Sequence, residues 1–504
     1  MAVARHQRQE RGQGQGVPRG VRAVAVLAAG GGREDAGLLV VPDRLCGQTV
    51  GPRQIDRPEL PARLKVFFHL ADNIAAPSRK SLHRMFNDSV ERMPIDIKDT
   101  TRTLDAAGLM ELLGTRPRVL ALGEPTHGED TLLDLRNDLF RQLIQEEGYR
   151  TVAIESDCLR GLVVDEYLAT GEGTLDAVME QGFSHGLGAS AANRELVRWM
   201  REYNAARPAA DRLRFAGFDG PLEIAGAESP RQALTALHGL LAASVDPALL
   251  PCDAGTLDGL LGADGPWTDE GVMWDPALSV GRSAGARELR LLAGELVELL
   301  DEHAPQLISE TSREDWERAR LYGRTATGLL HYHHGTADRS ASRWSRLSGV
   351  RDRMMADNLL ALAERGPVLV FAHNAHLQRE RSSMRMGGTP LEWWSAGALV
   401  NARLGGEYAF VSTAVGTIRH HGVDTPPPDT VEGLLHALPE DRCLVDARRL
   451  AAALGGTPPA RRVSPWFGYA PLDPAHLAAS DGLVYVRDLP PEAELRREVG
   501  RPGR

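Results

Sequence analysis

The stretch from residue 119 to residue 154 constrains the fold of this chain more than any other feature. The apolar runs Val119–Leu122 and Thr151–Ile154 are typical of buried strands. Between them apolar residues recur at helical spacing, at Leu132, Leu135, Leu139 and Leu143. Gly148 ends the helix. A strand–helix–strand unit of this length implies a right-handed crossover between parallel strands, so we expect an α/β protein.

Further apolar runs extend this pattern along the chain. The strand candidates are Leu213–Phe218, Val368–Phe371, Tyr408–Ala414, Leu444–Asp446 and Leu483–Val486. Between residues 229 and 363 the period is helical instead, at Leu234–Leu241, Ala286–Leu300 and Glu314–Leu330. We therefore predict an α/β fold with a three-layer core and a mainly parallel sheet, interrupted by a helical insert or cap.

The same patterns suggest a division into five segments. We expect residues 93–228 and 364–490 to form the two parts of the α/β core, with the helical insert at 229–363 between them. Residues 1–92 keep no helical or strand period, and we expect a poorly ordered tail that arises from an over-long start. Residues 491–504 are expected to form a C-terminal tail.

The charge balance excludes two classes of partner. The chain has 58 lysines and arginines against 68 aspartates and glutamates, a net charge of −10, whereas nucleic acids and anionic membranes attract clustered cations. No apolar run approaches the ~18 residues that span a bilayer. The best signal-peptide candidate, Val21–Ala29, is short and is followed by three glycines. We expect a cytoplasmic protein that binds neither nucleic acid nor membranes; the sequence leaves its oligomeric state unknown.

The cysteines indicate neither a zinc knuckle nor a disulfide framework. They lie far apart and form no C-x-x-C pair, at Cys46, Cys158, Cys252 and Cys443. This usage fits a reducing compartment, and we predict neither a metal nor a cofactor.

Polar side chains follow four of the predicted strands. In chain order they are Glu124 with His127, then Glu155, then Asp219, and finally His373 with His376. Ligands bind outside the carboxyl ends of the strands in open parallel sheets. Four strands that deliver carboxylates and imidazoles to one edge predict a shared polar site.

His127 is the candidate general base. It lies in the loop Gly123–Gly128, whose glycines let the backbone turn sharply and approach a ligand. Its imidazole can take a proton from water and later return it, while Glu124 or Glu155 fixes the tautomer and stabilises the imidazolium. Arg136, nine residues further on, would bring its guanidinium to the same rim, where it would hold a carboxylate or an oxyanion.

Taken together, these motifs resemble the erythromycin esterase family. The resemblance covers about residues 95 to 490, in order. It rests on Val119–Gly128, Asp134–Arg136, Val152–Glu155, Phe215–Asp219, Arg351–Ala356 and His373–His376, and then on Met386-Gly387 with Leu391, Gly468-Tyr469 and Asp481–Val486.

The resemblance implies a hydrolase that opens a lactone ester, of the macrolide type that underlies antibiotic resistance, with an activated water and no obligatory metal. The family's general base falls on His127. Its other functional positions fall on Glu124, Arg136, Glu155, His373 and His376, and all hold the expected residue type. The chain departs from the family pattern at Ala372 and at Phe183–Gly188, which puts the shape of the substrate in doubt.

Two roles remain to be assigned near the fourth strand. We expect His373 and His376 to donate hydrogen bonds to the developing oxyanion or to protonate the leaving alkoxide; the alternative is that they cap the next helix. Asp219 and Asn374 are the candidate substrate-binding residues, and Asp219 also has a purely structural alternative.

Four other functions compete with this interpretation. The first is a metal-dependent hydrolase that uses the same histidines and glutamates. The second is a serine hydrolase with Ser283 in the G-x-S-x-G motif Gly281–Gly285, although Ser283 is better explained as a helix N-cap. The third is a binding module without turnover, and the fourth is a biosynthetic tailoring enzyme that acts on an ester or hydroxyl of another metabolite. His331, His333 and His334 are left out of the site because histidines favour a helix C-terminus.

Overall fold

The computed structural model describes residues 97–491, apart from residues 224–225, 387 and 456–457. The expected N-terminal tail and all but the first residue of the expected C-terminal tail therefore lie outside the described residues. The chain divides into two units, of which residues 92–384 and 391–504 form one. All of the elements and contacts discussed below belong to this unit, except where β8 (Arg381–Met386) and β9 (Thr389–Trp394) run into the other.

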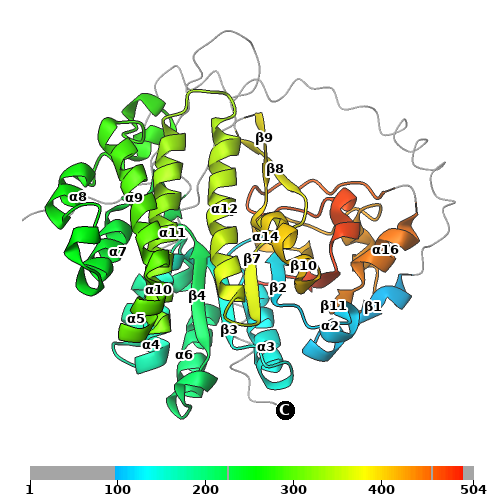
Figure 1. Cartoon of the computed structure of the whole chain (residues 1–504). Coiled ribbons are helices and arrows are strands. Elements are labelled where there is room, and N and C mark those ends of the chain that lie inside the picture. Colours follow the sequence, from blue (N-terminus) through cyan, green and yellow to red (C-terminus); the bar gives the residue numbers. More distant parts are fainter. Residues whose placement is uncertain (1–96, 224–225, 387, 456–457, 492–504) are drawn as a thin grey trace, which may run out of the picture. The chain divides into compact units, whose positions relative to one another are not determined.

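An eight-stranded sheet forms the centre of this unit (Figure 1), with the strand order β1-β11-β12-β10-β2-β7-β3-β4. The five neighbouring pairs from β12 to β4 are parallel, and the β1–β11 and β11–β12 pairs are antiparallel. The expected mainly parallel sheet is thus confirmed. The strands are β1 (Thr101–Arg102), β2 (Val119–Glu124), β3 (Thr151–Asp157), β4 (Arg214–Asp219), β7 (Val368–His373), β10 (Tyr408–Thr417), β11 (Arg442–Val445) and β12 (Gly482–Asp488).

Helices cover both faces of the sheet. Successive side chains of each strand point to opposite faces, so both faces present apolar residues. In β2, Leu120 and Leu122 pack with α3 (Asp130–Glu146) and α6 (Ala191–Ala205) in one core cluster. Val119 and Ala121 point to the opposite face and pack with α12 (Arg343–Ala363) and α14 (Ala396–Leu404). The three-layer core that the sequence predicts is therefore present.

The segment at 229–363 contains helices with two kinds of packing. In one group, α7, α8, α9 and α11 share a separate apolar cluster. In contrast, α12 packs on the sheet, where Met355 and Leu359 are fully buried. The bounds of the helices in this segment are α7 (Arg231–Ser244), α8 (Ala254–Leu261), α9 (Ala284–Glu302), α10 (Ala304–Glu310), α11 (Arg313–Thr336) and α12 (Arg343–Ala363). The division into five segments stays a prediction.

The remaining elements are short or connect the strands. They are α2 (Ala106–Leu113), α4 (Cys158–Thr170), α5 (Leu175–Gln181), α13 (Asn374–Leu377), α15 (Val431–His436), α16 (Ala447–Leu454), β5 (Leu222–Glu223) and β6 (Gly226–Ala227). Within the part of the chain that the structure describes, no helix is long and apolar enough to cross a membrane.

Candidate active site

The carboxyl ends of four adjacent parallel strands meet at one edge of the sheet. Glu124 and His373 are the last residues of β2 and β7, and they are register partners. Glu155 lies near the end of β3, on the other side of β7, and Asp219 ends β4. These four residues belong to the strands themselves rather than to the loops beyond them, because the strands run one to three residues further than the apolar runs. Their convergence follows from parallel pairing.

His127 lies in the loop between β2 and α3, and half of its side chain is exposed. Its Nδ1 atom is 2.7 Å from Oε1 of Glu124, and its Nε2 atom is 3.9 Å from Oε1 of Glu155. Partial burial lowers the pKa of His127, but the charges of Glu155 and Glu124 outweigh this effect and raise the pKa to about 9. The imidazole therefore carries a proton at neutral pH and becomes a base as the pH rises.

Glu124 supports this histidine from the interior. Burial raises the pKa of its carboxyl, although the hydrogen bond with His127 opposes the shift. Its Oε1 atom faces the imidazole, whereas its buried Oε2 atom has no hydrogen-bond partner among the described residues. The pair can therefore shift a proton toward the carboxylate, which is an arrangement suited to acid–base chemistry.

Glu155 remains a carboxylate because several cations and donors surround it. The backbone N–H of His373 donates to its Oε2 atom at 2.9 Å, and Arg351 donates to Oε1 at 3.2 Å. Burial alone would raise its pKa, but the charges of His376, His127 and Arg351 hold the pKa well below its ordinary value. This carboxylate provides a fixed negative charge beside Nε2 of His127.

His376 is held between two carboxylates. Its Nδ1 atom is 2.7 Å from Oδ1 of Asp352, and its Nε2 atom is 3.3 Å from Oε1 of Glu155. Burial lowers the pKa of His376, but the two carboxylates outweigh this effect and raise it. Asp352 is itself fixed by the backbone N–H of Ala396, 2.9 Å away. Both ring nitrogens of His376 therefore contact carboxylates, and one of these is Glu155.

His373 is neutral and braces the loop that carries His127. Burial and the nearby charge of His127 lower its pKa to about 3, against a hydrogen bond with the backbone of Pro125. Its Nδ1 atom accepts the N–H of Ala375 at 3.2 Å, and so it also caps α13. The centroid of its ring lies 5.3 Å from that of His127.

A second group of charges adjoins Glu155, and sequence reasoning did not assign three of its members, Arg351, His185 and Glu223, to the site. Arg351 donates to both oxygens of Asp219, at 2.7–3.2 Å, and bridges to Glu155. His185 lies between Asp219 and Glu223, with contacts of 3.1 and 2.8 Å. The carboxylate of Asp219 is fully buried and is engaged by Arg351 and His185. Its expected role in substrate binding stays a prediction.

Two signals in the sequence pointed toward the missed residues. Arg351 stands in a segment quoted for the family resemblance, and His185 lies in Phe183–Gly188, where the chain departs from the family pattern. The backbone φ of His185 is +54°, and among the described residues it is the one non-glycine with a positive φ. Side-chain partners hold this strained residue in place.

The structure places Arg136 and Asn374 differently from the sequence expectation. The guanidinium of Arg136 is buried over the ring of Phe371 and donates to the side chains of Asn137 and Asn193, so it lies inside the protein rather than at the rim. Its charge acts on Glu124 through the interior. The reason is that helical spacing fixes the face of a helix on which a residue lies but not its depth.

The amide of Asn374 bonds β10 instead of facing a ligand. Its Nδ2 atom donates to the carbonyl of Thr413 at 2.9 Å, and its Oδ1 atom accepts the N–H of Thr413 at 3.1 Å. Gly123 permits this approach, because a Cβ atom at that position would lie 2.1 Å from Oδ1 of Asn374. The amide of Asn374 is therefore engaged within the protein, and its role in substrate binding stays a prediction.

Ser283, the nucleophile of the serine-hydrolase alternative, and His333, one of the histidines left out of the site, both have structural contacts. Ser283 is the N-cap of α9 and accepts the N–H of Ala286 at 3.1 Å, which confirms its capping role. The His333 ring bonds the carbonyl of Glu228, and burial lowers its pKa to about 4. In the described part of the chain, the one cluster of three or more potential metal ligands is Glu129 with His420 and His421, none of which belongs to the set that the metal-hydrolase alternative uses.

Comparisons with known proteins agree with this architecture. The sequence model described as "Erythromycin esterase" matches residues 144–488, a range that includes Glu155, His373 and His376 but begins after His127. A crystal structure of a protein from Bacillus cereus covers 82% of this chain and 98% of its own, at 16% identity and a TM-score of 0.59. A succinoglycan biosynthesis protein covers 79% and 97%, at 18% identity and a TM-score of 0.58. A mutant of the erythromycin esterase EreC in its open conformation covers 77% and 96%, at 19% identity and a TM-score of 0.55.

Proposed function

The chain belongs to the erythromycin esterase family, and on that premise we propose that it is a carboxylic ester hydrolase that opens a lactone or ester of a small molecule with His127 as general base. One observation carries the proposal. His127 is half exposed, its Nδ1 atom lies 2.7 Å from a buried glutamate, and a second carboxylate lies beside its Nε2 atom. A general base needs this combination of access and charge support.

In the proposed reaction, neutral His127 takes a proton from water through Nε2 while Glu124 accepts the hydrogen bond from Nδ1–H. The water oxygen attacks the carbonyl carbon of the ester. The bond between this carbon and the alkoxide oxygen then breaks, and the alkoxide takes the proton back from His127. The products are an acid and an alcohol. Glu124 and Glu155 stabilise the imidazolium that forms between the two proton transfers.

We assign positioning roles to the histidine pair. Both nitrogens of His376 face carboxylates, and His373 bonds the backbone of Ala375 and Pro125. In these contacts His376 holds Glu155, and His373 holds the loop of His127. This assignment replaces the direct contact with an oxyanion that the sequence analysis expected.

A macrolide-type lactone is the substrate class that the family membership favours. A pocket adjoins His373 and is lined by both apolar and polar side chains, including Phe410, Leu472 and Gln378. A tailoring enzyme acting on another metabolite stays the alternative, because one neighbour of the same fold is a succinoglycan biosynthesis protein and another is an erythromycin esterase. The cytoplasmic location stays a prediction.

Mass spectrometry after incubation with a panel of macrolides and simple esters tests the proposal. The expected result with the wild type is a lactone product that is heavier by one water. In His127→Ala the rate of this hydrolysis should fall by about 10²–10⁴-fold. His303→Ala is the matched control, because the His303 ring bonds the carbonyl of Leu299 at the end of α9. Hydrolysis at the wild-type rate by folded His127→Ala would overturn the role of His127. If the wild-type protein changes the mass of none of the esters, the proposed hydrolase activity is overturned.

A further inference from the structure

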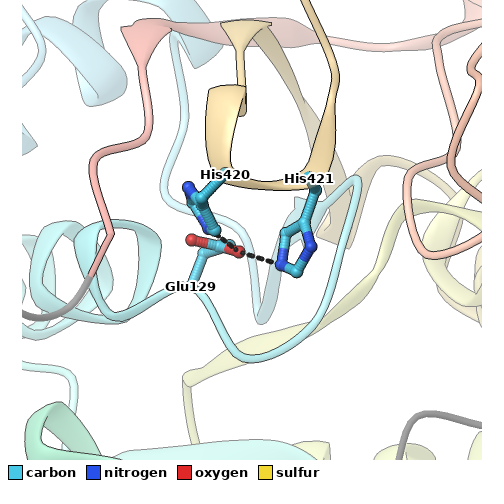
Figure 2. A group of neighbouring side chains, drawn as sticks. All are labelled: Glu129, His420 and His421. Atoms are coloured by element: carbon cyan, nitrogen blue, oxygen red, sulfur yellow. Dashed lines mark hydrogen bonds and ion pairs between the residues drawn. The ribbon is translucent and has the colours of Figure 1, made fainter. Parts of the chain in front are cut away.

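Glu129 and the neighbouring His420 and His421 form a cluster outside the proposed catalytic residues. Nε2 of His420 lies 3.1 Å, and Nε2 of His421 lies 3.5 Å, from the same Oε1 atom of Glu129. Figure 2 shows the two imidazoles approaching that oxygen from one turn of the chain. One ligand atom from each of the three residues lies within 4.8 Å of the other two.

These separations agree with the geometry of a tetrahedral metal site. Zinc binds imidazole nitrogen and carboxylate oxygen at about 2.0–2.2 Å, so two ligands of one tetrahedral ion lie about 3.4 Å apart. The observed 3.1 and 3.5 Å lie on either side of this value. Two imidazoles and one carboxylate are also the donor types that zinc and similar divalent ions bind.

The surroundings hold the ligands in this arrangement. Glu129 is buried at the N-cap position of α3, and its side chain makes no capping hydrogen bond there. His420 and His421 end a short 3₁₀ turn whose flanking residues, Ile418 and Val423, pair as an isolated bridge. The ring of His421 stacks on Trp466, with centroids 3.8 Å apart and planes at 12°. Such outer contacts fix the orientation of a ligand before the ion arrives.

We propose that Glu129, His420 and His421 bind one divalent transition-metal ion of the zinc class, with water completing its coordination. The ligands come from two segments of the chain that are 291 residues apart. Glu129 lies two residues after His127, so the bound ion ties the loop that carries the proposed base to the turn after β10. The role is structural, and no step of the proposed hydrolysis passes through the ion.

The test uses the full chain after treatment with a chelator, with zinc chloride as the probe. Calorimetry should give one ion per chain, and saturating zinc should raise the Tm by about 4 °C, because a ligand that binds the folded state stabilises it. Glu129→Gln, His420→Gln and His421→Gln should each weaken binding at least tenfold. His303→Gln should bind zinc as the wild type does.

Two results would overturn the proposal. The first is the absence of saturable zinc binding by the wild type, and the second is zinc affinity in all three variants equal to that of the wild type. Cobalt serves as a further probe on the wild type, so the outcome does not depend on the folding of a variant. Intense visible absorption from tetrahedral cobalt is the expected result, and the weak spectrum of an octahedral aquo ion counts against the site.

Discussion

Glu124 and His373 are register partners at the ends of the adjacent parallel strands β2 and β7. The side chain of Glu124 bonds His127 at 2.7 Å, while His373 packs its ring 5.3 Å from the ring of the same histidine. One pair in the sheet therefore holds the exposed imidazole from two sides. This arrangement makes the protonation and the position of His127 sensitive to a buried strand-end residue, Glu124, and to a partly buried one, His373.

The first prediction concerns the pH dependence of hydrolysis. The pKa of His127 is raised to about 9, so the base form is scarce at neutral pH and accumulates as the pH rises. In metal-free protein, kcat/KM should increase about tenfold per pH unit up to about pH 9 and then level off. Initial rates between about pH 6 and 10, corrected for spontaneous ester hydrolysis, give the profile. A flat profile above about pH 7 would contradict the assignment.

Glu155→Gln should move that profile to lower pH. The charge of Glu155 helps to raise the pKa of His127, so its removal should shift the rising limb by about one unit or more. Loss of the carboxylate also removes one of the two buried carboxylate partners of Arg351 and of His376, which should cost about 1–3 kcal/mol of stability. Urea unfolding and the pH profile measure the two effects separately. If Glu155→Gln loses stability but the rising limb of its pH profile does not move, Glu155 has a structural role only.

The third prediction tests the packing beneath the site. In Gly123→Ala the new methyl group would clash with the amide of Asn374, which is fixed to the backbone of Thr413. The variant should lose about 1–3 kcal/mol of unfolding free energy. Gly239→Ala is the matched control, since a Cβ atom there meets nothing within 4 Å, and it should stabilise α7 by about 0.5–1 kcal/mol. Equal stability of the two variants would remove the steric argument.

The sequence was sufficient to predict that polar side chains from several strand ends converge at one edge of the sheet. Glu124, Glu155, Asp219 and His373 each follow an apolar run, and parallel pairing brings the ends of such strands together. The order of the strands could not be predicted from the sequence, because β7 lies between β2 and β3 although it is distant from both in the chain. Side chains that meet through such non-local pairing leave no periodic signal.

The contacts and depths of individual side chains could not be predicted in the same way. The contact of Asp352 with His376 depends on how α12 packs against the sheet, and the contact of His185 with Asp219 depends on a single residue in a left-handed conformation. Arg136 follows the helical period of α3, but that period is the same whether the guanidinium lies at the rim or in the interior.

His185 gives the last prediction, which concerns stability rather than activity. Burial lowers the pKa of His185, but its hydrogen bonds to Asp219 and Glu223 outweigh this effect and raise it from 6.5 to about 9. A raised pKa in the folded state means that the imidazolium stabilises the fold fully below about pH 6.5, and that this stabilisation is lost as the pH rises through about 9.

His185→Gln should therefore be less stable than the wild type by about 1–3 kcal/mol near pH 6, and the difference should shrink steadily toward pH 9. The left-handed backbone at this position adds a cost to either residue that does not depend on pH. Urea unfolding at several pH values measures the difference, with His303→Gln as a control for a histidine that lies outside the carboxylate network. If the difference between wild type and His185→Gln stays constant across this range, the imidazolium does not carry the stabilisation, and the contacts of His185 act through packing alone.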